Sequence, residues 1–307
     1  MSLETDLLLD RRRLKRRLVF WRTFAVIILA IAVLAGLRNA GIGFRGPHIA
    51  RLSVNGLITE NRKLTEAVGR IADDPHVKAL IVSIDSPGGS VAGGESLHDA
   101  IARVAAKKPV VAVMGGLAAS AGYMIAVPAD RIFAREATLT GSIGVIMETG
   151  EVSGLLAKLG ITADAITSGP LKDQPSFTKP MTAEGREVLH GLVMDMYDQF
   201  VTMVATGRHL DPDRVRALAD GRAYTGRQAL KLGLIDAIGG EREARQWLKA
   251  TKGVGTDLPV EDVSTTGLAA RMVADSLGPM LGDLWKTLVS QSVSLDGAWA
   301  VWQRSGN

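Results

Sequence analysis

The chain has 307 residues, of which 47% are hydrophobic and 22% charged, so it can build a sizeable core and is neither disordered nor fibrous. Its formal net charge of +4 arises at the N-terminal end, because residues 1–22 hold seven basic and three acidic side chains, which leaves 29 of each beyond them. That balance argues against nucleic acid as a partner. The absence of cysteine excludes disulfides, thiolate metal sites and cysteine nucleophiles, and the five histidines show no metal-ligand spacing.

The first predicted element is a membrane anchor. Residues 24–37 form an uninterrupted apolar run, and extension to 18–37 gives the ~20 residues that a bilayer requires. Arg22 lies one turn inside the basic end, from where its guanidinium can reach the headgroups. The basic cluster within residues 1–17 predicts a cytoplasmic N-terminus and export of the remainder. The alternative is a cleaved signal peptide. No clear small-x-small cleavage site follows the run, which argues against this alternative.

A Gly-rich linker, residues 38–48, leads into a region where short β-branched runs alternate with helical patterns. This alternation predicts an α/β fold with βαβ crossovers and a mainly parallel sheet. The predicted strands are 49–54, 79–85, 109–114 and 161–167, and the predicted helices are 61–72, 91–106, 182–206, 211–219 and 225–232. We place a folded domain at 49–253 and a weakly patterned tail at 254–307.

Two glycine-containing junctions are candidate functional segments. Residues 86–90 (SPGGS) follow a predicted strand, and their glycines allow a tight turn with amide N–H groups left open to an anion. An ordinary strand-to-helix turn explains the same pattern. Ser120 lies in GGLAASAGY (115–123) among small neighbours, as a serine nucleophile needs if a peptide carbonyl is to approach it. A small-residue packing site or a helix cap is the alternative.

A serine nucleophile requires a base, and none of the histidines has a recognisable partner motif. A lysine can serve if it is desolvated and neutral. Lys172 lies in the Pro- and Gly-containing loop SGPLKD (168–173), although a solvated loop lysine is the ordinary alternative and Asp173 is adjacent.

Taken together, the motifs resemble the signal peptide peptidase A family in its short bacterial form. The resemblance rests on the N-terminal anchor and on five segments in the family's order, namely 86–89 (SPGG), 118–123 (AASAGY), 140–145 (TGSIGV), 168–173 (SGPLKD) and 224–236 (YTGRQALKLGLID). It implies a Clp protease/crotonase-like fold and a Ser–Lys dyad that cleaves membrane-associated signal peptide remnants. It also implies a bacterial inner-membrane protein with its catalytic domain on the extracytoplasmic side.

Carried over to this chain, the resemblance makes Ser120 the nucleophile, Lys172 the base and Ser142 the residue that holds the lysine. Gly89 and Ala121 would supply the oxyanion N–H groups. No metal or organic cofactor is implied. Lys179 lies seven residues after Lys172 and is the alternative base, but Lys172 alone fits the SG-x-x-K pattern.

Two other functions remain open at this point: a crotonase-like acyl-CoA enzyme that transfers protons with carboxylates, and a catalytically silent membrane scaffold. The expected partners are peptide substrates, membrane lipid through the anchor, and further copies of the chain. A homo-oligomer is expected because long members of the family carry two copies of the fold and this sequence shows one. Three tryptophans, within 285–289 and 298–302, predict an interface or docking role for the tail. The alternatives are that the tail lies on the membrane or occupies the protein's own substrate groove.

Overall fold

The structure is a computed structural model and describes residues 17, 20–29 and 46–264. The chain divides into two units, one containing residues 47–265 and the other containing both ends of the chain. In the second unit the described residues 20–29 are helical, and the tryptophans of the tail lie outside the described residues. None of the described helices combines the length and apolar character that a membrane crossing requires. Half of the predicted 18–37 anchor, residues 18–19 and 30–37, also lies outside the described residues.

The folded unit is built on a mainly parallel sheet, which confirms the predicted α/β class. Its central strands are β1 (His48–Asn55), β2 (Val77–Ser86) and β3 (Val110–Ala119), joined by helices α2 (Arg62–Ile71) and α3 (Val91–Ala105). The sheet order is β6-β5-β3-β2-β1-β8, with β4 paired to β3 and β7. The shorter strands are β4 (Arg131–Ala134), β5 (Leu139–Gly141), β6 (Ala223–Thr225), β7 (Ala237–Ile238) and β8 (Val260–Asp262). Only the β5–β6 pair is antiparallel among the described strands.

Alternation along the strands divides the core between the two faces of the sheet. In β2, Leu80, Val82 and Ile84 belong to the larger cluster, which includes side chains of α2, α3 and the C-terminal end of α6 (Ala183–Arg208). Ala79 and Ile81 point the other way and pack with Ala244 and Leu248 of α9 (Glu241–Lys252). The β2 strand is therefore buried on both faces, as expected for a parallel sheet covered by helices.

The remaining helices are α4 (Ala121–Met124), α5 (Ser153–Lys158), α7 (Pro212–Leu218) and α8 (Gly226–Leu232). Thr182 caps α6, where the sequence predicts a helix start, and Thr225 caps α8. The strand predicted at 161–167 is wrong, because this segment forms no strand and Ile161 and Ile166 are exposed. Its alternating pattern has no neighbouring strand to pair with in the described part of the chain.

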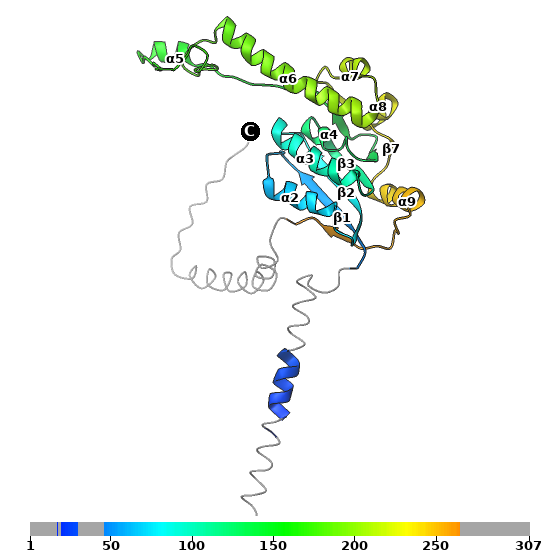
Figure 1. The fold of residues 1–307 in the computed structure, drawn as a ribbon. Coiled ribbons are helices and arrows are strands. Elements are labelled where there is room, and N and C mark those ends of the chain that lie inside the picture. Colours follow the sequence, from blue (N-terminus) through cyan, green and yellow to red (C-terminus); the bar gives the residue numbers. More distant parts are fainter. Residues whose placement is uncertain (1–16, 18–19, 30–45, 265–307) are drawn as a thin grey trace, which may run out of the picture. The chain divides into compact units, whose positions relative to one another are not determined.

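One long segment projects from the sheet. We call residues 145–195 the arm: it contains α5 and the N-terminal half of α6, and Figure 1 shows α5 at the far end of α6 from α7 and α8. Within the arm only Ser176 and Gly185 are buried. The C-terminal half of α6 is different, since Phe200 and Val204 enter the core. The arm therefore contributes almost nothing to the core of a single chain.

The C-terminal end of α6 is fastened to the sheet by a partly buried ion pair. The Arg208 guanidinium donates to both carboxylate oxygens of Asp236, at 2.6 and 3.0 Å, and the same carboxylate accepts the Ile132 N–H at 2.7 Å. The Arg208 side chain is 8% exposed and that of Asp236 is 27% exposed. Removal of one partner would leave a buried charge without its counter-ion. This pair should therefore contribute far more to the free energy of unfolding than a surface pair does.

We therefore expect Asp236→Ala to lower the free energy of unfolding by ~3–5 kcal/mol, the cost typical of an orphaned buried charge. The matched control is Asp198→Ala, which breaks the exposed Arg216–Asp198 pair and should cost at most ~1 kcal/mol. Urea unfolding of the full chain, followed by circular dichroism, measures both. Equal losses in the two variants would contradict the structural role given to Asp236.

Candidate active site

The site is built at the carboxyl end of β3. Ser120 links this strand to α4 and has φ 53° and ψ −123°, a left-handed backbone conformation that a non-glycine residue rarely adopts. The Ser120 N–H donates to the Gly141 carbonyl oxygen at 2.9 Å, and its hydroxyl makes no cap bond to α4. Residues held in such conformations cost ~1–3 kcal/mol and cluster at active sites. The turn leaves the Ser120 side chain partly exposed at the end of the strand.

The glycine-containing turn after β2 packs directly against this serine. A Cβ built on Gly88 would lie 2.8 Å from the Ser120 Cβ and 3.2 Å from the Ala121 nitrogen, and Gly88 has φ +113°. Only glycine permits both this approach and this backbone conformation. The sequence pattern pointed to Gly89 here and gave no role to Gly88. A signal was present, since both glycines belong to one SPGG turn, but nothing local shows which of them contacts the serine.

Two main-chain N–H groups are open near Ser120. Ala121 is the first residue of α4, so its N–H has no partner inside that helix. The Gly89 N–H has no hydrogen-bond partner within residues 46–264. On the far side of Gly89, Ile58 donates to the Gly88 carbonyl at 2.8 Å and accepts from the Ser90 N–H at 2.9 Å. The predicted oxyanion donors are thus free to bind a ligand oxygen.

Ser142 lies at the carboxyl end of the neighbouring strand, β5, one residue after the Gly141 carbonyl that binds Ser120. It also has a left-handed backbone, with φ 49°. Its N–H donates to the Arg222 carbonyl at 3.0 Å, and its hydroxyl donates to the Gly221 carbonyl at 3.2 Å. Two strained serines therefore stand on adjacent strand ends.

The predicted base lies elsewhere. Lys172 is exposed in a turn of the arm, where its N–H donates to the Gly169 carbonyl at 3.1 Å. Among the described residues, no hydrogen bond or ion pair joins its side chain to Ser120 or Ser142. The alternative base, Lys179, forms an ion pair with Asp164 at 3.1 Å, and this contact lowers the pKa of the Asp164 carboxyl. Among the described residues, Lys179 is therefore held at Asp164 and not at Ser120.

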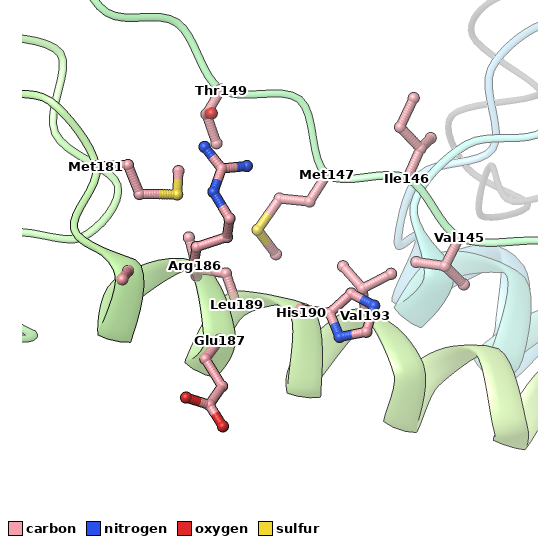
Figure 2. Close-up of a pocket in the computed structure, with 11 residues that line it drawn as sticks. Val145, Ile146, Met147, Thr149, Met181, Arg186, Glu187, Leu189, His190 and Val193 are labelled. Carbon is pink, nitrogen blue, oxygen red and sulfur yellow. The ribbon is translucent and has the colours of Figure 1, made fainter.

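A pocket of about 590 Å³ begins close to Ser142 and continues along the arm. Figure 2 shows the segment from Val145 to Thr149 running alongside α6, with the Arg186 side chain extending toward Thr149 and the Glu187 carboxylate pointing away. Its apolar lining comes from Val145, Ile146, Met147, Met181, Leu189 and Val193. Because Val145 is four residues from Gly141, the pocket starts at most ~14 Å from the carbonyl that binds Ser120.

The described residues contain no group of three or more His, Cys, Asp or Glu side chains that could hold a metal ion. Tyr123, buried behind the serine in α4, donates its hydroxyl to the Leu234 carbonyl at 2.8 Å, and burial raises its pKa well above the usual range. It is therefore a structural group of the core and not a proton carrier.

Comparison with known proteins places the chain among peptidases. The family model described as peptidase family S49 matches residues 102–255. A protease from Synechocystis is 40% identical over 68% of this chain and 76% of its own length. A signal peptide peptidase, SppA, from Enterococcus faecium is 36% identical over 78% of this chain and 74% of its own length. A solved membrane-bound stomatin-specific protease is 16% identical over 71% of this chain and 98% of its own, with a TM-score of 0.49.

Proposed function

Because the chain belongs to peptidase family S49 and is a serine peptidase, we propose that Ser120 is its nucleophile and Lys172 its general base. The observation that carries the assignment of Ser120 is its strained strand-to-helix turn, packed against Gly88 with two open N–H groups beside it. Lys172 is favoured over Lys179 because Lys179 is already paired with a carboxylate. The chain has no cysteine that could serve as an alternative nucleophile.

The proposed reaction is an acyl transfer in two steps. Neutral Lys172 Nζ takes the hydroxyl proton while Ser120 Oγ attacks the peptide carbonyl carbon, and the resulting oxyanion accepts hydrogen bonds from the Gly89 and Ala121 N–H groups. Collapse breaks the C–N bond, and the lysine returns the proton to the leaving amine. Water then hydrolyses the acyl-enzyme, again with the lysine as base. Ser142 is proposed to hydrogen-bond the lysine and hold it in place.

We propose that the substrates are membrane-associated peptides, including signal peptide remnants. The apolar lining of the arm pocket supports this class, because a cleft of that character binds apolar side chains and starts close to Ser142. The name of the Enterococcus relative points the same way. A crotonase-like acyl-CoA enzyme and a silent scaffold are the other functions to be tested against this one. Neither accounts for a strained serine in a peptidase family.

For location, we propose a single-pass protein of the bacterial inner membrane, with residues 1–17 in the cytoplasm, residues 18–37 as the anchor and the folded unit on the extracytoplasmic side. The basic cluster before the apolar run supports this orientation.

We further propose that the peptidase works as a ring-like homo-oligomer in which copies complete one another's sites. The arm supports this, because it exposes large apolar side chains that are each more than half accessible in a single chain. These are Ile146, Leu155, Leu159, Ile161, Ile166, Phe177 and Leu192. Apolar surface of this extent usually marks an interface. It also lies on the segment that carries Lys172, so a neighbour that covers the arm would bury the proposed base.

The dyad predicts that Ser120→Ala and Lys172→Ala each lower kcat/KM on a peptide substrate by at least ~10³-fold, since members of one catalytic unit fail together. Labelling with a serine-reactive fluorophosphonate should occur at Ser120 and disappear in Ser120→Ala. Lys158→Ala, an exposed lysine on the same arm, is the control and should retain activity. Near wild-type turnover in Lys172→Ala, with loss in Lys179→Ala, would reassign the base.

The topology predicts that protease added to intact spheroplasts digests the part of the chain after about residue 40, because the positive-inside rule exports it. Immunoblots against the folded unit report the result, with a cytoplasmic protein as the lysis control. Complete protection until the cells are lysed would reverse the orientation.

The oligomer predicts that the activity of the full chain in detergent falls in step with its mass on dilution, as shared sites require. Leu155→Asp on the arm should shift dissociation to higher protein concentration, because it places a charge in the proposed interface. Leu230→Asp, an exposed apolar position outside the arm, is the control. Light scattering and peptide hydrolysis measure the two quantities together, and a fully active monomer would refute the ring.

A further inference from the structure

Ser86 is a buried hydroxyl that the proposed mechanism does not use. It is the last residue of β2 and is 0% exposed. Its Oγ accepts the Gly88 N–H at 3.1 Å and donates to the Gly88 carbonyl oxygen at 3.3 Å. A serine that bonds the main chain two residues ahead forms a local turn and fixes its shape. The Ser86 side chain therefore determines how the chain leaves β2.

The peptide unit that Ser86 holds is the one that packs on the nucleophile. Gly88 lies so close to Ser120 and Ala121 that a methyl group on it would overlap the Ser120 side chain. On its other side, the Ile58 N–H donates to the Gly88 carbonyl. The Gly88 peptide is thus fixed from three directions: by Ser86 within its own turn, by Ile58 and by the serine turn.

Gly89 follows in a parallel bridge to Ile58, whose two hydrogen bonds use the Gly88 carbonyl and the Ser90 N–H. Main-chain groups alternate in direction along an extended strand, so the N–H of Gly89 points away from Ile58. Gly89 also touches Ile58, since a Cβ on it would lie 1.9 Å from the Ile58 carbonyl oxygen. The direction of the Gly89 N–H is therefore determined by the position of its neighbours, above all Gly88.

The main chain of Ser86 also contacts the nucleophile's own turn. Ser86 pairs with Ala118 in the β2–β3 register. A Cβ built on Gly122 would lie 2.9 Å from the Ser86 carbonyl oxygen, so this carbonyl packs against α4. One residue thus contacts both the turn that carries Gly89 and the helix that begins with Ala121.

We infer that Ser86 is a positioning residue that sets the Gly89 N–H relative to the Ala121 N–H, so that both reach one oxyanion. This inference rests on the proposed serine peptidase function. Without the hydroxyl, the Gly88 N–H would be buried with no partner, and the turn would shift to find one. Oxyanion donors act in the transition state and not on the bound peptide, so the loss should appear in kcat and leave KM unchanged.

The test compares Ser86→Ala with Thr138→Val in the full chain. Thr138 is a matched control, because its hydroxyl is also buried, accepts one backbone N–H from Arg135 at 3.0 Å and donates to one carbonyl, that of Gly115, at 2.6 Å. We expect Ser86→Ala to lower kcat by ~10–100-fold with KM within about twofold, somewhat less than the loss of a whole oxyanion donor. Thr138→Val should lose comparable thermal stability with kcat within about twofold.

Equal kcat losses in the two variants, or a change confined to KM, would overturn the inference. If Ser86→Ala does not fold, Ser86→Cys replaces it, because a thiol fills the space but bonds weakly. A kcat at least fivefold below wild type supports the positioning role, and a wild-type kcat refutes it. Fluorophosphonate labelling distinguishes a failure of the proposed peptidase function from a failure of the positioning role of Ser86. An unlabelled wild-type Ser120 would refute the proposed function itself, whereas a labelled wild type with an unimpaired Ser86→Ala would refute this inference alone.

Discussion

The site depends on the close approach of two main-chain segments, the turn after β2 and the turn after β3. Gly88 and Ser120 approach so closely that a side chain on Gly88 would overlap the serine. Gly122 makes a second approach of this kind, to the Ser86 carbonyl. These contacts hold Ser120 in a backbone conformation that a free serine avoids. The strain at the serine is balanced by the packing of its neighbours.

The parallel sheet explains why these turns meet. Carboxyl ends of parallel strands lie along one edge of a sheet, and this edge carries the residues after β1, β2, β3 and β5. Ile58, the Gly88–Gly89 turn, Ser120 and Ser142 come from these four strand ends in chain order. The short pairing of β5 with β3 has a specific consequence, since it brings the Gly141 carbonyl to the Ser120 N–H and so puts Ser142 beside the serine.

Local patterns predicted the parts of the fold that local chemistry determines. β1, β2 and β3 are apolar runs bounded by Gly, Pro or Asp, α6 begins at a threonine cap and α8 follows a helical pattern, so each was visible in the sequence. β4 to β8 have two to four residues and exist only through distant partners, as when Ala237 pairs with Phe133. The prediction for residues 161–167 fails in the opposite way. Their alternating apolar pattern suits a strand, but the described part of the fold has no neighbouring strand with which they could pair. The motif around Ser120 was likewise visible, whereas the contact of Gly88 and the bonds of Ser86 depend on two strand ends meeting.

The arm raises the question of how a lysine there becomes a base. A lysine must be neutral to take a proton, and near neutral pH this demands removal from water. Lys172 is exposed in the single chain, on a segment whose apolar side chains are exposed as well. Association with a neighbouring copy would meet both needs, because a surface that covers the apolar side chains of the arm would also remove Lys172 from water. In the proposed mechanism, assembly would therefore do more than bring two residues together: it would create the environment in which one of them can act, and an isolated chain would hold a strained serine without a working base.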